Sequence, residues 1–299
     1  MGHSLPKVMN DQEISLNSVA FSYYPKSRKK PRKFALKGID LKINAQDEFI
    51  GIVGHTGSGK STIVQVLNAL IRPEEGSADI LGYHVEKKNK ITLKPIRRAV
   101  GLCFQFPEYQ LFEENCLKDI MYGPKNFGLE DPEGCARQAV KEIEFDEALL
   151  TESPFALSGG QMRKVALAGI LACQPEVLIF DEPTVGLDPA SQEDLIRLLQ
   201  KLNSEHHTII MITHNMDVMA KLCKRVIVMK AGHVEYDGPK DELFRDQGIC
   251  EKYDIDYPRS IKILQSLKEK LDLKDLDIYQ YSLEDCKKEI MRVLGDDHE

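Results

Sequence analysis

Apolar residues in this chain occur in short runs, and between the runs they recur every three or four positions. Short apolar runs predict strands, and the periodic segments predict helices. The run at residues 49–53 is followed by a segment with Ile63, Val66, Leu67 and Leu70 on one face, which predicts a helix over residues 62–71. Further strands are expected at residues 14–19, 39–43, 78–81, 100–104, 177–180, 208–213, 226–230 and 233–236. This alternation predicts an α/β core with a largely parallel sheet, in which the early strands pair as hairpins.

The pattern becomes purely helical after residue 106. Apolar positions recur at helical spacing up to residue 157, and a further helix is expected at residues 162–171. We therefore expect an inserted helical subdomain over about residues 106–170 of a main domain at residues 11–238.

The strand pattern ends near Gly238, and residues 239–299 are expected to form a helical extension. One apolar stripe is formed by Ile261, Leu264, Leu267 and Leu271. A second helix is expected to begin with a capping box at Ser282 and Asp285 and to carry the stripe Leu283, Cys286, Ile290 and Leu294. We expect these stripes to pack partly on the main domain and partly on another subunit.

Composition narrows the class of protein. The chain has 42% hydrophobic and 29% charged residues, enough for a large core, and its net charge of -7 argues against a general nucleic-acid binder. No apolar stretch approaches the roughly 20 residues that cross a bilayer, and residues 1–10 lack the apolar core of a secretory signal, so any membrane contact is expected to go through a partner. The 7 cysteines are never spaced C-x-x-C and are expected to be free thiols in a reducing cytosol.

One basic run interrupts this acidic chain. It lies between two expected strands and comprises Lys26, Arg28, Lys29, Lys30, Arg32 and Lys33. A solvated hairpin tip explains such a run, and so does contact with anionic lipid headgroups or nucleotide phosphates.

The most informative motif follows the strand at residues 49–53. It fits the phosphate-loop pattern G-x-x-x-x-G-K-[ST] and continues into the expected helix; its residues are Gly54, His55, Thr56, Gly57, Ser58, Gly59, Lys60, Ser61 and Thr62. The order strand, loop, helix directs unpaired backbone N–H groups and the positive end of the helix dipole at whatever the loop holds. Lys60 is expected to reach the terminal phosphates of a nucleotide, and the Ser61 hydroxyl is expected to ligate Mg²⁺.

Two acids end the apolar strand at residues 177–180. Asp181 is expected to hold Mg²⁺ through water, and Glu182 is expected to orient and polarise the attacking water. A polar strand end before the turn at Pro183 is the alternative, which the phosphate loop makes much weaker.

Between these motifs lies Leu157-Ser158-Gly159-Gly160-Gln161, ahead of a helix. With this segment, residues 14–238 resemble the ATP-binding-cassette family, whose signature is LSGGQ. The resemblance implies a phosphate-loop ATPase with a mixed or parallel α/β core, an antiparallel β subdomain, a helical subdomain and, here, a small helical C-terminal extension. In the family, the signature faces the nucleotide bound by the opposite subunit. The resemblance therefore implies a dimer that sandwiches ATP and Mg²⁺, with Ser158, Gly159, Gly160 and Gln161 touching the partner-bound ATP.

The resemblance assigns four further residues. Gln105 matches the glutamine that ligates Mg²⁺, and Tyr23 matches the aromatic that stacks on adenine, although Tyr24 leaves that register open. His214 matches the catalytic histidine at the γ-phosphate. Asp188 matches a dimer contact, and it also reads as an N-cap before Pro189. Residues 162–164, Met-Arg-Lys, depart from the glutamine and arginine common in the family, which puts subunit contacts of that helix in question.

Residues 104–112 and 159–163 resemble the ATPase subunits of energy-coupling factor transporters, in particular the second of their two related ATPases. The resemblance implies a heterodimer with the partner ATPase at the cytoplasmic face of a prokaryotic membrane. It also implies a transmembrane coupling subunit and an interchangeable membrane subunit that captures vitamins or metal ions. We expect Glu108, Glu113 and Glu114 to form an acidic groove for basic helices of that membrane partner, or else a solvated acidic loop.

Three other functions compete. A conventional importer would use the same ATPase chemistry, and a homodimer would then serve paired permeases. A cassette ATPase acting on nucleic acid or ribosomes usually carries two cassettes or a long coiled coil, and this chain has neither. A nucleotide-binding subunit without hydrolysis is disfavoured because Lys60, Asp181, Glu182 and His214 are all present.

Overall fold

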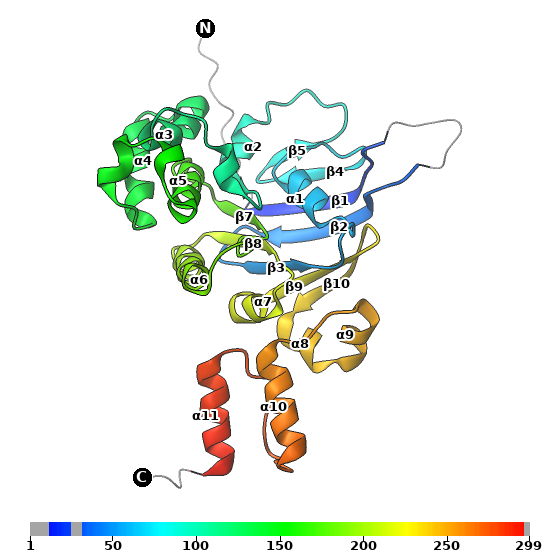
Figure 1. Cartoon of the computed structure of the whole chain (residues 1–299). Helices are drawn as coiled ribbons and strands as arrows, with labels where there is room; N and C mark the ends of the chain where they lie inside the picture. Colours follow the sequence, from blue (N-terminus) through cyan, green and yellow to red (C-terminus); the bar gives the residue numbers. More distant parts are fainter. Residues whose placement is uncertain (1–11, 25–31, 296–299) are drawn as a thin grey trace.

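The computed structural model describes residues 12–24 and 32–295 and contains two sheets (Figure 1). The larger sheet has six strands in the order β10-β9-β3-β8-β7-β6. Its strands are β3 (Phe49–Val53), β6 (Val100–Cys103), β7 (Val177–Asp181), β8 (Thr208–Ile212), β9 (Arg225–Lys230) and β10 (His233–Pro239). All neighbouring pairs are parallel except β9 and β10. The predicted α/β class with a largely parallel core is therefore confirmed.

The second sheet is antiparallel and has four strands in the order β2-β1-β4-β5. They are β1 (Glu13–Phe21), β2 (Leu36–Asn44), β4 (Glu75–Ile80) and β5 (Tyr83–Val85). The expected pairing of the early strands is confirmed by the β1–β2 ladder. The sequence pattern missed β5, because three residues are too few to show an alternation.

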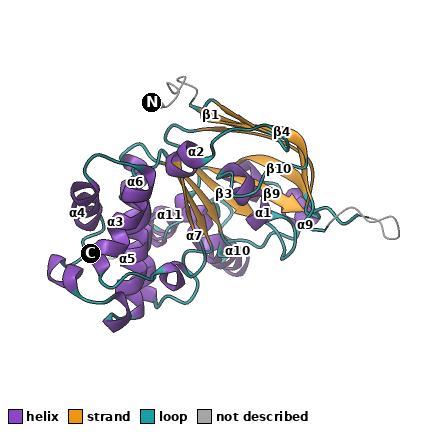
Figure 2. Cartoon of the chain, turned by 90° about the horizontal axis from the view of Figure 1, so that it is seen from above, coloured by secondary structure: helices purple, strands orange, loops and turns teal. Residues whose placement is uncertain are grey.

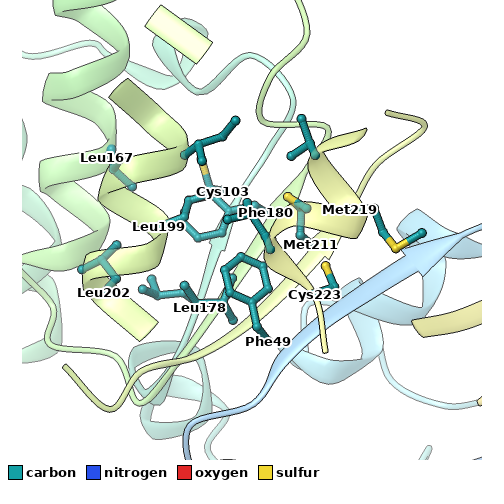
Figure 3. Close-up of a cluster of buried hydrophobic side chains, with 14 of the residues drawn as sticks. Phe49, Cys103, Leu167, Leu178, Phe180, Leu199, Leu202, Met211, Met219 and Cys223 are labelled. Carbon is teal, nitrogen blue, oxygen red and sulfur yellow. The ribbon is translucent and has the colours of Figure 1, made fainter. Parts of the chain in front are cut away.

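Alternate residues of the parallel strands enter two different cores, because successive side chains of a strand point to opposite faces. Ile50, Ile52 and Ile179 pack with helix α1 (Lys60–Leu67) and the antiparallel sheet. Phe49 and Phe180 belong to the other core, which holds side chains of α5 (Gly159–Leu171), α6 (Pro189–Ser204) and α7 (Met216–Leu222) (Figure 3). Burial on both faces explains why these strands read as continuous apolar runs.

The remaining helices of residues 60–230 cover the larger sheet or form a separate group. They are α2 (Lys94–Ala99), α3 (Cys116–Phe127), α4 (Pro132–Glu142), α5 (Gly159–Leu171), α6 (Pro189–Ser204) and α7 (Met216–Leu222). Three short 3-10 helices, Pro107–Gln110, Glu147–Thr151 and Pro154–Ala156, lie between β6 and β7. Figure 2 shows α3, α4 and α5 gathered on the side away from the antiparallel sheet. No strand occurs at residues 104–176, all of which the structure describes.

Helix α1 differs from the expected helix at residues 62–71. It begins at Lys60 and ends at Leu67, and Ala69 has a left-handed backbone with φ 52°. Leu70, expected on the buried face, is exposed for this reason. Helix α5 likewise begins earlier than expected, so that Gly159 and Gly160 form its first turn.

The C-terminal segment contains α8 (Lys240–Arg245), α9 (Gln247–Tyr253), α10 (Arg259–Lys270) and α11 (Leu283–Leu294). Helix α10 buries Ile261 and Leu264 and contacts α7. Helix α11 lies beside α10 and has no buried residue (Figure 1). Its start is capped by Ser282 as expected, but Asp285 bonds the Ser282 hydroxyl rather than the backbone N–H. Of the first expected stripe, Ile261 and Leu264 are buried whereas Leu271 is exposed, and no residue of the second stripe is buried.

Three features of composition can be placed in the fold. All 7 cysteines are free. Among the described residues, no helix is both long and apolar enough to span a membrane. Most of the basic run lies in residues 25–31, outside the described residues, whereas Arg32 pairs with Glu74 and lies over the Phe34 ring.

Candidate nucleotide site

The phosphate loop connects β3 to α1, and two of its glycines cannot be replaced without a clash. Gly54 has φ 143°, and a Cβ there would lie 2.1 Å from the Met229 carbonyl oxygen. Gly59 has φ 109°, and its Cβ would lie 2.7 Å from the Ala35 carbonyl oxygen. Only glycine tolerates this backbone conformation at such a close approach. The two glycines therefore allow the loop to lie directly against β9 and against Ala35, next to the antiparallel sheet.

Lys60, the first residue of α1, folds back over the loop. Its Nζ donates to the carbonyl oxygens of Gly54 at 2.6 Å and His55 at 3.0 Å. Burial lowers the pKa of Lys60, and the nearby carboxylates of Glu182 and Asp181 oppose that shift. The loop and the acids at the end of β7 thus converge on one site, as the sequence predicted.

Asp181 ends β7, next to the start of α1. Burial raises its pKa, and a hydrogen bond with the Ser61 side chain and the charge of Lys60 oppose the shift. The two side chains expected to bind or support Mg²⁺ are therefore in direct contact.

Glu182 follows in a left-handed backbone conformation with φ 51° and is fixed by β8 and His214. Its N–H donates to the Ile212 carbonyl oxygen, and its Oε2 accepts a hydrogen bond from the His214 N–H at 3.3 Å. Burial raises the pKa of Glu182, whereas burial and the charge of Lys60 lower the pKa of His214. His214 Nε2 lies 3.3 Å from Glu182 Oε1.

Two buried polar atoms of this site, Ser58 Oγ and Glu182 Oε1, make no hydrogen bond within the described residues, and the contact of Glu182 Oε1 with His214 Nε2 lacks hydrogen-bond geometry. Buried polar groups are nearly always hydrogen-bonded, so unpaired ones call for a ligand or water. Around them are the oxygens of Asp181, Ser61 and Glu182, which are the donor type that Mg²⁺ prefers, and the Lys60 ammonium, which suits phosphate. The residues present therefore fit Mg²⁺ and a nucleotide phosphate chain.

Tyr23 lies over the first turns of α1. Its hydroxyl is 3.2 Å from Thr62 Oγ1 and donates to Gln65 Oε1 at 3.2 Å, and its ring is 57% exposed. Tyr24 is also exposed, but its hydrogen bonds in the described structure go to Ser22 and not to α1. Tyr23 is thus the tyrosine beside the start of α1, which favours Tyr23 over Tyr24 as the match to the adenine-stacking aromatic.

Gln105 lies exposed just after β6, in a segment held by Arg163 of α5. Arg163 forms an ion pair with Glu108, with Nε 3.3 Å from Oε2, and donates to the Gln105 carbonyl oxygen at 3.4 Å. Glu108 is 14% exposed and already paired, so the expected acidic groove is wrong for this residue. Glu114 pairs with Lys118, and only Glu113 of the three glutamates keeps its carboxylate without an ion pair in the described structure.

The signature segment forms the start of α5. Ser158 Oγ accepts from the Gln161 N–H, and Gln161 Oε1 accepts from the Ser158 N–H, which completes a capping box. A Cβ at Gly159 or Gly160 would meet nothing within 4 Å, so this end of the helix is open. Within the described residues, the hydrogen bonds of Ser158 and Gln161 stay inside the cap and do not reach the phosphate loop.

Asp188 caps α6 as expected, accepting from the N–H groups of Ala190 and Ser191. Hydrogen bonds from Ser191 lower the pKa of Asp188. Its carboxylate is exposed, so the second expected role, a dimer contact, stays a prediction.

Two residues near the site have contacts that sequence reasoning did not anticipate. His55 Nε2 lies 3.1 Å from Asp254 Oδ2, which joins the phosphate loop to the end of α9. In the sequence, Arg163 is notable only because residues 162–164 depart from the residues common in the family. No local pattern predicts either contact, because their partners lie far away in the sequence.

Comparison with known proteins shows the family to which this chain belongs. Residues 36–185 match the family model described as ABC transporter. The ATP-binding cassette MJ0796, solved as a dimer in a post-hydrolysis state with ADP and Pi, is 30% identical and superposes with a TM-score of 0.65 over 76% of this chain and 98% of that one. The chain belongs to the ATP-binding-cassette family of ATPases, which use ATP with Mg²⁺.

Similar proteins show to which group within this family the chain belongs. The energy-coupling factor transporter ATP-binding protein EcfA2 of Bacillus cereus is 42% identical over 287 residues, 94% of this chain and 96% of that protein. The EcfA2 of Clostridioides difficile is 43% identical over 266 residues, 87% of this chain and 91% of that protein. The cbiO1 protein of Clostridium perfringens, part of the ABC transporter complex cbiONQ, is 31% identical with a TM-score of 0.68, over 85% of this chain and 98% of that one. Within the family, the chain is an energy-coupling factor transporter ATPase, which decides against the conventional importer and the nucleic-acid alternatives.

Proposed function

We propose specific roles for the residues with which this ATPase hydrolyses ATP. Lys60 and the loop residues Gly54 to Thr62 bind the phosphates, and Tyr23 stacks on the adenine. Ser61, Gln105 and, through water, Asp181 would hold Mg²⁺, which would supply positive charge to neutralise the charge that develops on the phosphates. The observation that carries this proposal is the convergence of the Lys60 ammonium with the carboxylates of β7 at one end of the sheet.

Glu182 orients the attacking water and polarises it. The His214 N–H fixes the carboxylate at Oε2, and the buried Oε1, which lies 3.3 Å from His214 Nε2 without a hydrogen bond, accepts the proton of a water. As the water oxygen bonds to the γ-phosphorus, the bond from that phosphorus to the ADP oxygen breaks, and phosphate leaves. His214 contacts the γ-phosphate, and in the chain without nucleotide burial and the charge of Lys60 lower the pKa of its imidazole.

A second copy of the cassette fold completes the site. The signature of α5 is open to solvent and its hydrogen bonds stay away from its own phosphate loop, which supports its use on ATP held by a partner subunit. In this arrangement, ATP binding closes the dimer and hydrolysis opens it. The resemblance to one of two related ATPases favours an unlike partner ATPase.

The membrane partners bind beside Gln105. Exposed aromatic rings gather on the segments around it: Phe104, Phe106, Tyr109, Phe112 and Tyr122. One of these rings, Phe104, also lines a surface hollow together with Leu70, Phe127, Arg97 and Arg98. Contiguous exposed apolar surface marks an interaction site, so we assign it to the transmembrane coupling subunit. A membrane subunit that captures vitamins or metal ions completes the transporter, and the chain lies at the cytoplasmic face of the membrane.

The replacement Glu182→Gln tests the catalytic assignment. It removes the general base but keeps the shape and the His214 contact, so turnover should fall about a hundredfold or more while ATP binding is retained. The matched control is Glu193→Gln, because Glu193 is an exposed glutamate on α6 paired with Lys221. Wild-type turnover in the Glu182 variant, measured as phosphate release by the assembled transporter, would show that the role is misassigned.

A further inference from the structure

Arg163, in the second turn of α5, joins three segments of the chain that are far apart in sequence. Its guanidinium contacts both carboxylate oxygens of Glu108, Oε2 from Nε at 3.3 Å and Oε1 from NH2 at 3.4 Å. It also donates to the carbonyl oxygens of Gln105 at 3.4 Å, Pro183 at 3.4 Å and Val185 at 3.3 Å. The sequence pattern gives this arginine no role.

The contacts use the geometry of arginine. A planar guanidinium has five N–H donors in a fixed fork, so one side chain can bind a carboxylate at two points and still donate to backbone oxygens on its other edge. The Arg163 and Glu108 side chains are only 13% and 14% exposed. The ion pair is therefore largely shielded from solvent, where removing one partner leaves an uncompensated charge.

The three segments are the ones on which hydrolysis depends. The segment at residues 105–108 carries the proposed Mg²⁺ ligand Gln105, and the segment at residues 183–185 directly follows the proposed general base Glu182. Helix α5 begins with the signature, five residues before Arg163. Arg163 thus ties the helix that serves the partner's ATP to the two segments that serve this chain's own ATP.

We propose that Arg163 is a positioning residue for hydrolysis, which sets Gln105 and Glu182 in place relative to the signature helix. This inference rests on the roles proposed above for Gln105 and Glu182. It explains how closure of the signature on the partner's nucleotide is transmitted to this chain's own pocket: α5, residues 105–108 and residues 183–185 move as one unit. Lysine cannot replace arginine here, because one ammonium cannot reach Glu108 and the carbonyl oxygens on both segments together.

The test compares Arg163→Lys and Arg163→Gln with the unmodified transporter, assembled with its partner ATPase and membrane subunits. Since a misplacement of about 1 Å can cost roughly a hundredfold in rate, we expect kcat to fall at least about tenfold in both variants. The Mg²⁺ concentration for half-maximal turnover should rise, whereas the affinity of the full chain for ATP should stay within about twofold, because Arg163 makes no contact with the phosphate loop. Arg137→Lys and Arg137→Gln are the matched controls, since Arg137 forms an ion pair with Glu133 on the exposed surface of α4, and they should change none of these values.

Glu108→Gln separates the ion pair from the carbonyl contacts. It should lower kcat less than Arg163→Gln does, and the double variant should cost less than the two single effects combined. Wild-type kcat in Arg163→Lys and Arg163→Gln, or a loss that appears only in KM or only in the melting temperature, would overturn the proposal. Glu182→Gln in the same assay distinguishes the two failures: if it retains turnover, the proposed site roles are wrong, and if it abolishes turnover while the Arg163 variants are fully active, only the positioning role is wrong.

Discussion

Gly54 is the residue of the phosphate loop at which the surrounding structure leaves least room. The loop pattern in the sequence requires a glycine there but does not say what fills the space. The structure supplies the reason, since the Met229 carbonyl of β9 lies where a side chain would begin. Gly57 differs, because it also has a positive φ of 79° but a Cβ added there would meet nothing within 4 Å.

This difference predicts unequal effects of alanine at the two positions. Gly54→Ala adds a backbone clash to the left-handed strain and should lower the free energy of unfolding by about 3 kcal/mol or more. Gly57→Ala, the control, meets only the strain and should cost about 1 kcal/mol. Urea unfolding without nucleotide measures both values. Equal losses would mean that the contact with Met229 is relieved by a shift of β9.

Helix α5 shows how one element combines a structural and a functional role in the same residue. Ser158 caps the helix, and the family resemblance makes it a contact to ATP held by the partner. The two residues of the capping box, Ser158 and Gln161, lie three positions apart in the sequence. The apolar periodicity nevertheless predicted a later start of the helix. Gly159 and Gly160 have low helix propensity, and the cap compensates for them.

Two substitutions at Ser158 separate these roles. Ser158→Ala removes the cap and should cost about 1 kcal/mol of stability. Ser158→Asp keeps a good cap and should leave stability nearly unchanged, but its charge should repel the phosphates and prevent ATP-dependent pairing of the two ATPases. Gel filtration with ATP in the Glu182→Gln background measures the pairing. Full ATP-dependent pairing of the Ser158→Asp variant would show that the signature does not lie at the interface between the two ATPases.

Helix α11 is held mainly by polar contacts, because none of its residues is buried. The Glu289 carboxylate accepts from the Asp277 N–H at 2.7 Å and from Arg292 Nε at 2.8 Å. These hydrogen bonds, the one with Arg292 foremost, lower the pKa of Glu289 from 4.5 to about 2.

The lowered pKa predicts that α11 loosens in acid, because protonation of Glu289 weakens both its pair with Arg292 inside the helix and its hydrogen bond from the Asp277 N–H outside it. A carboxyl group whose pKa is lower in the folded state stabilises the fold above its unfolded pKa, so this contribution is complete above pH 4.5 and is lost as the pH falls toward about 2. Hydrogen exchange of residues 283–294 should therefore accelerate over this range, and Glu289→Gln should show fast exchange already at pH 7. Lys288→Gln serves as the control at an exposed site of the same helix. Unchanged exchange in Glu289→Gln would show that another contact holds the helix.

At the scale of the whole molecule, the surface divides into regions for different partners. The exposed aromatic residues near Gln105 belong to the helical region, whereas Leu283 of α11, 91% exposed, belongs to the C-terminal extension. Periodicity correctly marked the α11 positions as apolar. Periodicity could not predict that none of these residues is buried, because burial depends on what packs against a helix and not on the sequence of the helix itself.

Tyr109 tests the assignment of the aromatic surface to the membrane partners. Its side chain is 82% exposed, so Tyr109→Ser should not lower the melting temperature of the isolated chain. Loss of its apolar area at an interface should reduce affinity for the membrane subunits about tenfold or more. Leu271→Ser, which removes exposed apolar surface from the end of α10, is the control. Undiminished co-purification of the membrane subunits with the Tyr109 variant would move their docking site elsewhere.

The amino-acid pattern alone was enough to place the strands of the parallel sheet, the phosphate loop and the acids at the end of β7. These features are local: an apolar run, a glycine-rich turn and a strand end each carry their pattern within a few residues. The meeting of Lys60 with Asp181 and Glu182 also followed, because parallel strands bring their carboxyl ends to one edge.

Which charged side chains are free of ion pairs depends on the folded arrangement of the chain. Glu108 reads as an exposed acid until Arg163, on a different element, is seen to cover it. The same holds for His55 and Asp254, which lie far apart in the chain and meet beside the phosphate loop. Such contacts depend on how helices and loops pack in three dimensions. Two side chains that are far apart in the sequence leave no local sequence pattern from which their pairing could be predicted.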